Sequence, residues 1–315
     1  MSAHEFFHYI NFDAAHARRI SYILFTRNRG SKLNDTIADL ERSLHADDEL
    51  IVVDGASTDS TEEVVLRHRN IVHIFLSEHD RSGQHAINKG VLLSRGKYII
   101  LLPDEDRVHG DGAEKAVEVM EKNPDIDLLV CGGTKHFLAR GTMSRPFYYG
   151  PGTHYGSTVE LQCTYGSCAN AFFIRRSVFA KVGLFPLDSA AWDPMWVVQC
   201  IYYGGVVKFA RINFFDHYIT EDSISHTRVP ELRTERMRFV KMYCSPKFAR
   251  AYQWKKSVWY RVFGIGGARD FVHSVRKIIR NDGVGGFIYW MFVHRKKGSG
   301  KKVRLLPPVW DGGFS

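Results

Sequence analysis

An acidic triplet follows an apolar segment near the middle of the chain. Asp104, Glu105 and Asp106 come directly after the strand-like residues 98–102 (YIILL) and a proline. Carboxylate oxygens are the ligands that Mg²⁺ and Mn²⁺ prefer, and these cations in turn bridge phosphate groups. Acidic loops are common, so the weight of this Asp-Xaa-Asp pattern depends on the segments around it.

Polar side chains follow each of the first four apolar segments. The four endings are Thr26-Arg27-Asn28, Asp54-Gly55-Ala56-Ser57, Glu78-His79-Asp80 and Asp104-Glu105-Asp106. In parallel sheets that are covered by helices, ligands bind at the carboxyl ends of the strands. Carboxylates that converge on one edge repel each other, so we expect this edge to hold a cation or a hydrogen-bonding ligand.

Alternating strand-like and helix-like segments must position these side chains. Strands are expected at 20–26, 49–54, 71–76, 98–102 and 128–131, and helices at 33–44, 60–69, 83–94, 113–122 and 192–203. Ser60 and Glu63 have the spacing of a capping box at the start of the second helix. Residues 133–165 predict irregular or hairpin structure that lines an acceptor groove. The alternation favours parallel βαβ units in an α/β, Rossmann-like fold.

Several motifs, in this order along the chain, resemble those of family 2 glycosyltransferases. They are 51–61 (IVVDGASTDST), 82–90 (SGQHAINKG), 96–106 (GKYIILLPDED), 172–179 (FFIRRSVF), 182–185 (VGLF), Asp193 with Gly204, and 223–226 (SISH). Each motif is modest, but the ordered set over residues 20–227 is specific. The resemblance implies the GT-A fold, a nucleotide-sugar donor and sugar transfer with inversion.

The resemblance also implies roles for individual residues. Thr26 and Asp54 are expected beside the nucleobase, and Asp104 and Asp106 around an Mn²⁺ or Mg²⁺ ion on the diphosphate and ribose. Asp193 matches the general base that takes the proton from the acceptor hydroxyl. Further expected contacts are Arg27, Ser57, Gln84, Asn88, Lys89 and Glu105 with the nucleotide sugar, His226 with the metal, and Trp192 with the acceptor.

Three positions depart from the family pattern. Gly55 stands where many members have a second carboxylate, which weakens the prediction of how the base is recognised. Glu105 makes the metal motif Asp-Glu-Asp, so the metal-binding carboxylate is open to a shift by one position. Trp192 stands where an acidic residue often precedes the base; it either stacks on a sugar ring or fills the core.

Structural roles remain open for several of these residues. The alternatives are Asp54 as a turn cap with Ser57, Asp193 as a helix N-cap before Pro194, Gln84 and Asn88 as buried hydrogen-bonded amides, and His226 as a surface histidine.

Composition and charge place the chain in a broad class. A hydrophobic fraction of 44% in 315 residues is typical of globular proteins and excludes collagen-like, mucin-like and wholly disordered chains. Residues 231–315 carry a formal charge of +14, and residues 1–230 carry −5. We therefore expect a catalytic GT-A domain over 1–229 and a basic helical extension over 230–315.

With five scattered cysteines and no signal-like or membrane-spanning segment, we expect a cytoplasmic protein with reduced thiols.

The basic extension mixes aromatic and cationic side chains over residues 250–297. This pattern is typical of a helix that lies in the plane of a membrane, so we expect peripheral contact at the inner membrane face. A helical subdomain that packs on the sheet is the equal alternative, and exposed aromatics also fit a homodimer. Nucleic-acid binding is disfavoured because the sequence contains no known reader module.

The sequence thus predicts a metal-dependent inverting glycosyltransferase with a UDP-sugar as the favoured donor and a saccharide or lipid-linked saccharide as acceptor. One alternative is sugar transfer to a modified nucleic-acid base or to a protein. Another is a non-catalytic GT-A module that binds a glycan or nucleotide, against which the intact Asp104, Asp106 and Asp193 argue.

Overall fold

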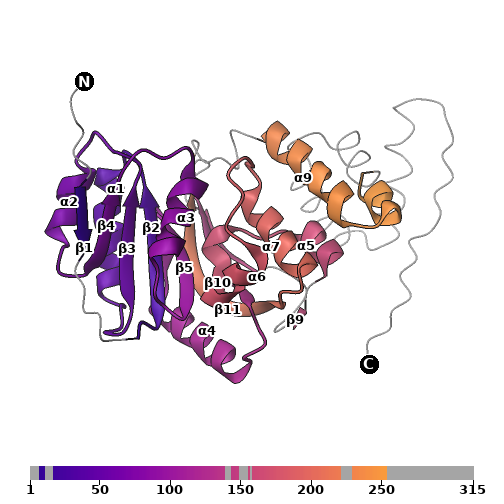
Figure 1. Cartoon of the computed structure of the whole chain (residues 1–315), viewed down its shortest axis with the longest axis horizontal. Coiled ribbons are helices and arrows are strands. Elements are labelled where there is room, and N and C mark those ends of the chain that lie inside the picture. The colour runs from indigo at the N-terminus through magenta and orange to yellow at the C-terminus, as the bar shows by residue number, and fades with distance from the viewer. Residues whose placement is uncertain are drawn as a thin grey trace, which may run out of the picture. The chain divides into compact units, whose positions relative to one another are not determined.

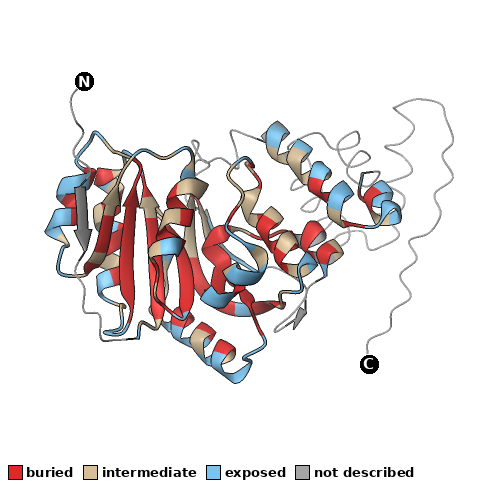
Figure 2. Cartoon of the chain, in the orientation of Figure 1, coloured by how far each residue is buried: buried red, intermediate tan, exposed pale blue. Residues whose placement is uncertain are grey.

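Parallel strands form the half of the sheet that carries the predicted motifs. The computed structural model describes residues 7–10, 17–138, 143–148, 155–156, 158–220 and 229–253. Four strands lie side by side and run in one direction, in the order β4 (Val72–Ser77), β3 (Glu49–Asp54), β2 (Ile20–Thr26) and β5 (Tyr98–Pro103). Their residues are apolar because other elements cover both faces of such a sheet. Figure 2 shows these strands as largely buried.

The other half of the sheet mixes strand directions. β10 (Phe172–Arg175) lies between β5 and β7 (Leu128–Phe137) and is antiparallel to both. The remaining strands are β11 (Val207–Ile219), parallel to β7; β6 (Arg107–Val108), antiparallel to β11; β1 (Phe7–Ile10), antiparallel to β4; β8 (Met143–Phe147), which forms a hairpin with β7; and β9 (Tyr155–Gly156), which pairs with β11. The α/β, Rossmann-like prediction is confirmed, with an antiparallel insertion at β10.

The long strand β11 was not predicted from the sequence. Its pairing with β7 shifts register between Phe209 and Asn213 and again between Asn213 and Phe215. These irregularities break the strict alternation of apolar and polar residues by which a strand is recognised. The hairpin of β7 and β8 confirms the hairpin structure expected within 133–165.

The helices are α1 (Gly30–Glu41), α2 (Thr61–Arg67), α3 (Gly83–Leu93), α4 (Gly110–Lys122), α5 (Val159–Tyr165), α6 (Phe179–Val182), α7 (Trp192–Tyr202) and α9 (Val229–Tyr243), with the 3₁₀ turns η2 (Ala169–Ala171) and η3 (Arg176–Val178). Helices α1, α2, α3, α4 and α7 lie where the apolar periodicity predicts them, whereas α5 and α6 were not predicted, and α5 corrects the expectation of irregular or hairpin structure at the end of 133–165. In Figure 1, α5, α6 and α7 are grouped at the end of the sheet away from α1 and α2.

The predicted capping box of α2 is wrong. Ser60 occupies the N-cap position, but its side chain makes no capping hydrogen bond. Asp59 accepts from the backbone N–H groups of Thr61 at 3.1 Å and of Gly30 at 3.0 Å. One carboxylate therefore serves the first turns of α2 and α1, which approach each other closely at Gly30: a Cβ there would lie 2.6 Å from the Ser60 hydroxyl oxygen.

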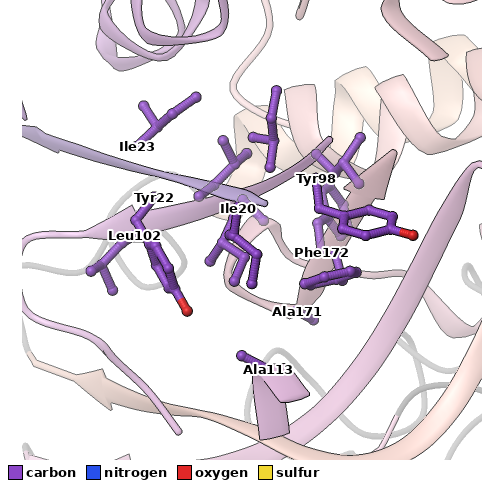
Figure 3. Packing of buried hydrophobic residues seen from close by; sticks show 14 of the residues in the cluster. Ile20, Tyr22, Ile23, Tyr98, Leu102, Ala113, Ala171 and Phe172 are labelled. Carbon is purple, nitrogen blue, oxygen red and sulfur yellow. The ribbon is translucent and has the colours of Figure 1, made fainter. Parts of the chain in front are cut away.

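Close packing joins the helices to both faces of β2. Figure 3 shows Tyr22 and Ile23 pointing to opposite faces of the strand, with Ala113 of α4 on the Tyr22 side. On the other face, α3 approaches β2 so closely that a Cβ on Gly90 would lie 2.3 Å from a methyl carbon of Ile23. The core therefore requires glycine at this point of α3.

Contacts divide the chain later than the sequence suggested. The two compact units are residues 1–249 and 250–315. The expected boundary after residue 229 falls at the start of α9, which contacts α5 and α7 and so belongs to the first unit. None of the described helices is both long and apolar enough to cross a bilayer. All five cysteines are free thiols.

Candidate functional site

The carboxyl ends of the parallel strands bring the predicted polar side chains to one edge. Thr26 pairs with Asp54 across β2 and β3, and Asp54 pairs with Ser77 across β3 and β4. On the other side of β2, Phe25 pairs with Pro103, directly before the acidic triplet. The sequence prediction that these strand ends share an edge is confirmed.

Asp54 is buried, with 1% of its surface exposed, and its carboxylate is occupied within the protein. It accepts hydrogen bonds from the Ser57 backbone N–H at 2.9 Å, from the Ser57 hydroxyl, and from the Ser77 hydroxyl at 2.6 Å. The turn-cap alternative for Asp54 is confirmed. The expected contacts of Asp54 and Ser57 with a nucleobase remain predictions, and they would have to share these oxygens.

Two loops beside Asp54 are joined by Asn28. Its backbone N–H donates to the Ser57 hydroxyl at 2.7 Å, and its side-chain oxygen accepts from the Thr58 N–H at 2.8 Å. Asn28 has φ of 53° and Ala56 has φ of 56°, a left-handed conformation that few residues adopt. This backbone is held in place by the contacts between the loops.

Glycine at position 55 has a steric reason. A Cβ there would lie 3.2 Å from Cδ of Arg27 and 3.3 Å from Oδ2 of Asp80. Because residue 55 has no side chain, the exposed Arg27 and the half-buried Asp80 can approach the end of β3. Many relatives have a second carboxylate at this position. Arg27 remains a predicted donor contact.

Lys89 is already paired with acidic side chains. Its ammonium group lies 2.7 Å from Glu78 and 2.7 Å from Asp80. Burial works to lower the pKa of Lys89, but the hydrogen bonds to both carboxylates outweigh it and the pKa is raised. Burial raises the pKa of Asp80. The predicted contact of Lys89 with a nucleotide sugar would require it to leave or share these partners.

The amides of α3 hold the segment that precedes α7. Asn88 is buried and donates to the Phe185 carbonyl at 2.8 Å, while its oxygen accepts from the Phe185 N–H at 3.0 Å. Gln84 donates to the Ser189 carbonyl at 2.7 Å. These bonds match the alternative of hydrogen-bonded structural amides for both residues.

The first two members of the acidic triplet have different surroundings. Asp104 accepts from the Thr26 hydroxyl at 2.9 Å, and burial raises the pKa of its carboxyl to about 6. Glu105 pairs with Arg29 at 2.8 Å and with Lys32, both at the start of α1. Glu105 is therefore paired with two cationic side chains, whereas the carboxylate of Asp104 is desolvated by burial.

Asp106 is held by residues that the sequence did not single out. It is 2% exposed and accepts from the Asn170 amide at 2.9 Å and the Tyr218 backbone N–H at 3.1 Å. Nδ1 of His217 lies 3.0 Å from its carboxylate. Asn170 belongs to η2 and His217 to β11, and no local pattern in the sequence indicated that these elements reach the acidic triplet.

Asp104 and Asp106 have the chemistry that a hard divalent cation requires. Both supply carboxylate oxygens, and burial raises the pKa of Asp104 against the lowering effects of the Thr26 hydrogen bond and of Arg29 and Lys32. Within the described residues, no three His, Cys, Asp or Glu side chains form a metal-binding group. A cation bound here would therefore take further oxygen ligands from its substrate. His226, the other predicted metal contact, lies outside the described residues.

Asp193 lies in the first turn of α7, and its predicted alternative role as N-cap is wrong. The N-cap residue is Ala191, without a side-chain capping bond. Burial raises the pKa of Asp193 to about 7, against the lowering effects of Arg236, of backbone N–H groups and of Lys135. The residue still keeps intermediate solvent exposure. A carboxyl that titrates near neutral pH and reaches solvent suits proton transfer.

Trp192 packs beside the core. Its ring meets that of Phe185 edge to face, with 5.1 Å between the ring centres, and the residue remains partly exposed. The expected core-filling role is therefore present. Its contact with an acceptor remains a prediction.

The short turn η2 links the acidic triplet to Asp193. Asn170 of this turn donates to Asp106 at 2.9 Å, and the backbone N–H of the preceding residue, Ala169, lies close enough to the Asp193 carboxyl to lower its pKa. Both residues are buried. Two carboxylates from distant parts of the sequence therefore lie beside adjacent residues of one turn.

Comparisons with known proteins indicate the family to which the chain belongs. The model of the family "Glycosyl transferase family 2" matches residues 21–183, which is more than half of the chain. A putative teichuronic acid biosynthesis glycosyltransferase of Bacillus subtilis is 28% identical over 104 residues, 32% of this chain and 41% of that protein. The chain spans about half the length of the first curated relatives that it matches.

Solved structures show the same fold at low sequence identity. The S. aureus TarS 1–349 complex with UDP-GlcNAc superposes with a TM-score of 0.55 at 16% identity, covering 71% of this chain and 66% of that one. The mannosyltransferase PcManGT of Pyrobaculum calidifontis, in complex with GDP-Man and Mn²⁺, gives 0.51 at 14% identity, covering 79% and 84%. The expected GT-A fold is confirmed. With its motifs, fold and family-model match in agreement, the chain belongs to glycosyl transferase family 2.

Proposed function

We propose that this chain transfers a sugar, with inversion, from a nucleotide-sugar donor to a hydroxyl group of an acceptor. The observation that carries the proposal is the linkage through η2. Asp106, from the acidic triplet, accepts a hydrogen bond from Asn170, and Asp193, from the first turn of α7, lies beside Ala169, the adjacent residue of that turn. The carboxylate on the leaving-group side and the carboxylate that serves the attacking hydroxyl therefore lie close to the same turn. A single displacement requires such a defined relative position.

Asp193 acts as the general base in this proposal. It takes the proton of the acceptor hydroxyl while that oxygen forms a bond to the anomeric carbon, and the bond from this carbon to the diphosphate oxygen breaks. Attack from the face opposite the leaving group inverts the configuration and needs no enzyme nucleophile. The pKa of Asp193, about 7, lets the carboxylate be ionised before the step and protonated after it.

Asp104 and Asp106, from the acidic triplet, orient the donor in this proposal. A bound Mn²⁺ or Mg²⁺ ion supplies positive charge that stabilises the nucleoside diphosphate as it leaves. Asp106 is buried and Asp104 is partly buried, and this desolvation strengthens their interactions with such a ligand. Glu105, paired with Arg29 and Lys32, is the less suitable ligand of the triplet.

The donor and acceptor are proposed by class. A UDP-sugar is favoured as donor, and the UDP-GlcNAc complex of TarS supports this choice at the level of fold. A saccharide or lipid-linked saccharide is the proposed acceptor, supported by the relative named for teichuronic acid biosynthesis. Peripheral contact with the inner membrane face, through the basic extension, would bring the enzyme to a lipid-linked acceptor.

The first test is thermal unfolding with UDP, GDP and their sugars, each with Mn²⁺, Mg²⁺ or a chelator. A ligand at a hundredfold excess over its dissociation constant stabilises the folded state by about 2.7 kcal/mol. We expect a metal-dependent shift with one nucleotide family, which Asp106→Asn reduces. Absence of any shift across the panel would contradict the proposed donor site.

Asp193→Asn then tests the base. We expect it to retain the metal-dependent shift but to lose release of nucleoside diphosphate in the presence of saccharide and lipid-linked acceptors. Asp188→Asn is the matched control, because Asp188 is an exposed residue of the same segment before α7. Transfer by the Asp193 variant at a rate near that of the unmodified protein would refute the assignment.

A further inference from the structure

The segment that leads into Asp193 is held by a carboxylate of α9. Oε2 of Glu235 accepts from the Ser189 hydroxyl at 2.7 Å and from the Ala191 backbone N–H at 2.9 Å. Ala191 is the N-cap residue of α7, two positions before Asp193. One carboxylate oxygen thus fixes the backbone at the point where α7 begins.

The next residue of α9 acts on Asp193 itself. The positive charge of Arg236 lowers the pKa of the Asp193 carboxyl, against the burial that raises it. The other groups that face this carboxyl are Lys135 of β7 and the backbone N–H groups of Ala169 and of Asp193. Gly166, at the end of α5, leaves room for the guanidinium group: a Cβ there would lie 3.3 Å from its Nη2 atom.

α9 is fixed firmly enough to serve as a support. Phe239 and Val240 on this helix are buried within the first unit. The Tyr243 hydroxyl accepts from the Gln199 amide of α7 at 3.3 Å, and the ring of Tyr243 meets that of Tyr202 at 5.1 Å between centres. Position and orientation of α9 are therefore tied to α7, the helix that carries Asp193.

We propose that α9 completes the catalytic centre, with Glu235 positioning the backbone that carries Asp193 and Arg236 supplying a fixed positive charge that acts on the Asp193 carboxylate. This inference rests on the proposed role of Asp193 as general base. Glu235 and Arg236 are positioning residues, because both act through Asp193. The helix lies within 230–315, the part of the sequence for which only a membrane-facing or packing role was expected.

The role of Glu235 predicts that its loss lowers kcat without weakening donor binding. Glu235→Ala leaves the Ala191 N–H without its carboxylate partner, so we expect kcat to fall about tenfold while the donor dissociation constant stays unchanged. Glu235→Gln keeps an acceptor oxygen of the same reach and should restore most of the rate. Glu231→Ala, at an exposed position of the same helix, is the matched control.

The role of Arg236 predicts a shift of the pH profile. Loss of a nearby positive charge disfavours the ionised carboxylate, so Arg236→Met should move the rising limb of kcat to higher pH by about 1 unit. Arg236→Lys should move it less. Arg238→Met, an exposed arginine on the same helix, should leave the limb unchanged.

The outcomes separate this inference from the proposed function. If Asp193→Asn abolishes transfer but Arg236→Met leaves the pH limb in place and Glu235→Ala leaves kcat unchanged, the inference is overturned and the general base stands. If Asp193→Asn transfers normally, the proposed base itself fails. Donor binding, measured by the metal-dependent thermal shift, shows that each variant is folded.

Discussion

At the scale of single residues, the proposed mechanism depends on the ionisation of Asp193. A general base has to be deprotonated before it can accept a proton. Because burial raises its pKa to about 7, we expect the transfer rate to rise with pH up to about that value and then to level off. A profile of kcat against pH checks this. A rate already level at pH 5 would contradict the raised pKa of the base.

Asn170 offers a second residue-scale prediction. Its amide donates to the buried Asp106 carboxylate, so Asn170→Ala leaves a buried charged group with one donor fewer. We expect a loss of about 1–3 kcal/mol in the free energy of unfolding, together with weaker metal-dependent nucleotide binding. Denaturant unfolding and metal titration measure the two effects. Asn70→Ala, which removes an exposed amide, should change neither.

The sequence revealed the carboxylates but not the residues that hold them. Asp54, Asp104 and Asp106 follow apolar strands, and parallel strands must end at one edge, so their proximity followed from the pattern. His217 and Asn170 contact Asp106 across about a hundred and about sixty positions of sequence respectively. No periodicity within a segment encodes such contacts, because they depend on which strand becomes the neighbour of which.

At the scale of elements, the sequence did not predict the order of the strands in the sheet. Strands β2 to β5 each showed a compact apolar run that predicted them to within a residue or two. β11 carries Lys208, Arg211 and Asp216 among its apolar residues and has two register shifts, so it lacked a clear period. Tertiary pairing with β7, rather than local propensity, makes it a strand.

Helix α3 provides a test of packing. Gly90→Ala places a methyl group against Ile23 of β2, and we expect it to lower the free energy of unfolding by about 1–3 kcal/mol. Gly83→Ala, at the first position of the same helix, meets no atom within 4 Å and should be neutral or slightly stabilising. Equal stability of the two variants would show that α3 can move away from the sheet.

At the scale of the whole molecule, charge is divided unevenly along the chain. Residues 231–315 carry +14 and residues 1–230 carry −5. If the extension contacts a membrane, the protein should co-sediment with anionic vesicles at low ionic strength. Binding should be lost near 1 M salt, where the screening length falls to about 3 Å. Vesicles of neutral lipid are the control, and equal binding to both would point to an apolar rather than an electrostatic contact.

The turn η2 has a consequence for how this enzyme can diverge. In the proposed mechanism, Asn170 of this turn holds the donor-side carboxylate Asp106 and the adjacent Ala169 lies beside the base Asp193, so a change in the backbone of the turn would affect both. Selection for a new acceptor that acts through residues 169–171 would disturb the hold on the leaving group at the same time. New acceptor preferences should therefore arise in the surrounding loops, while this turn keeps its shape.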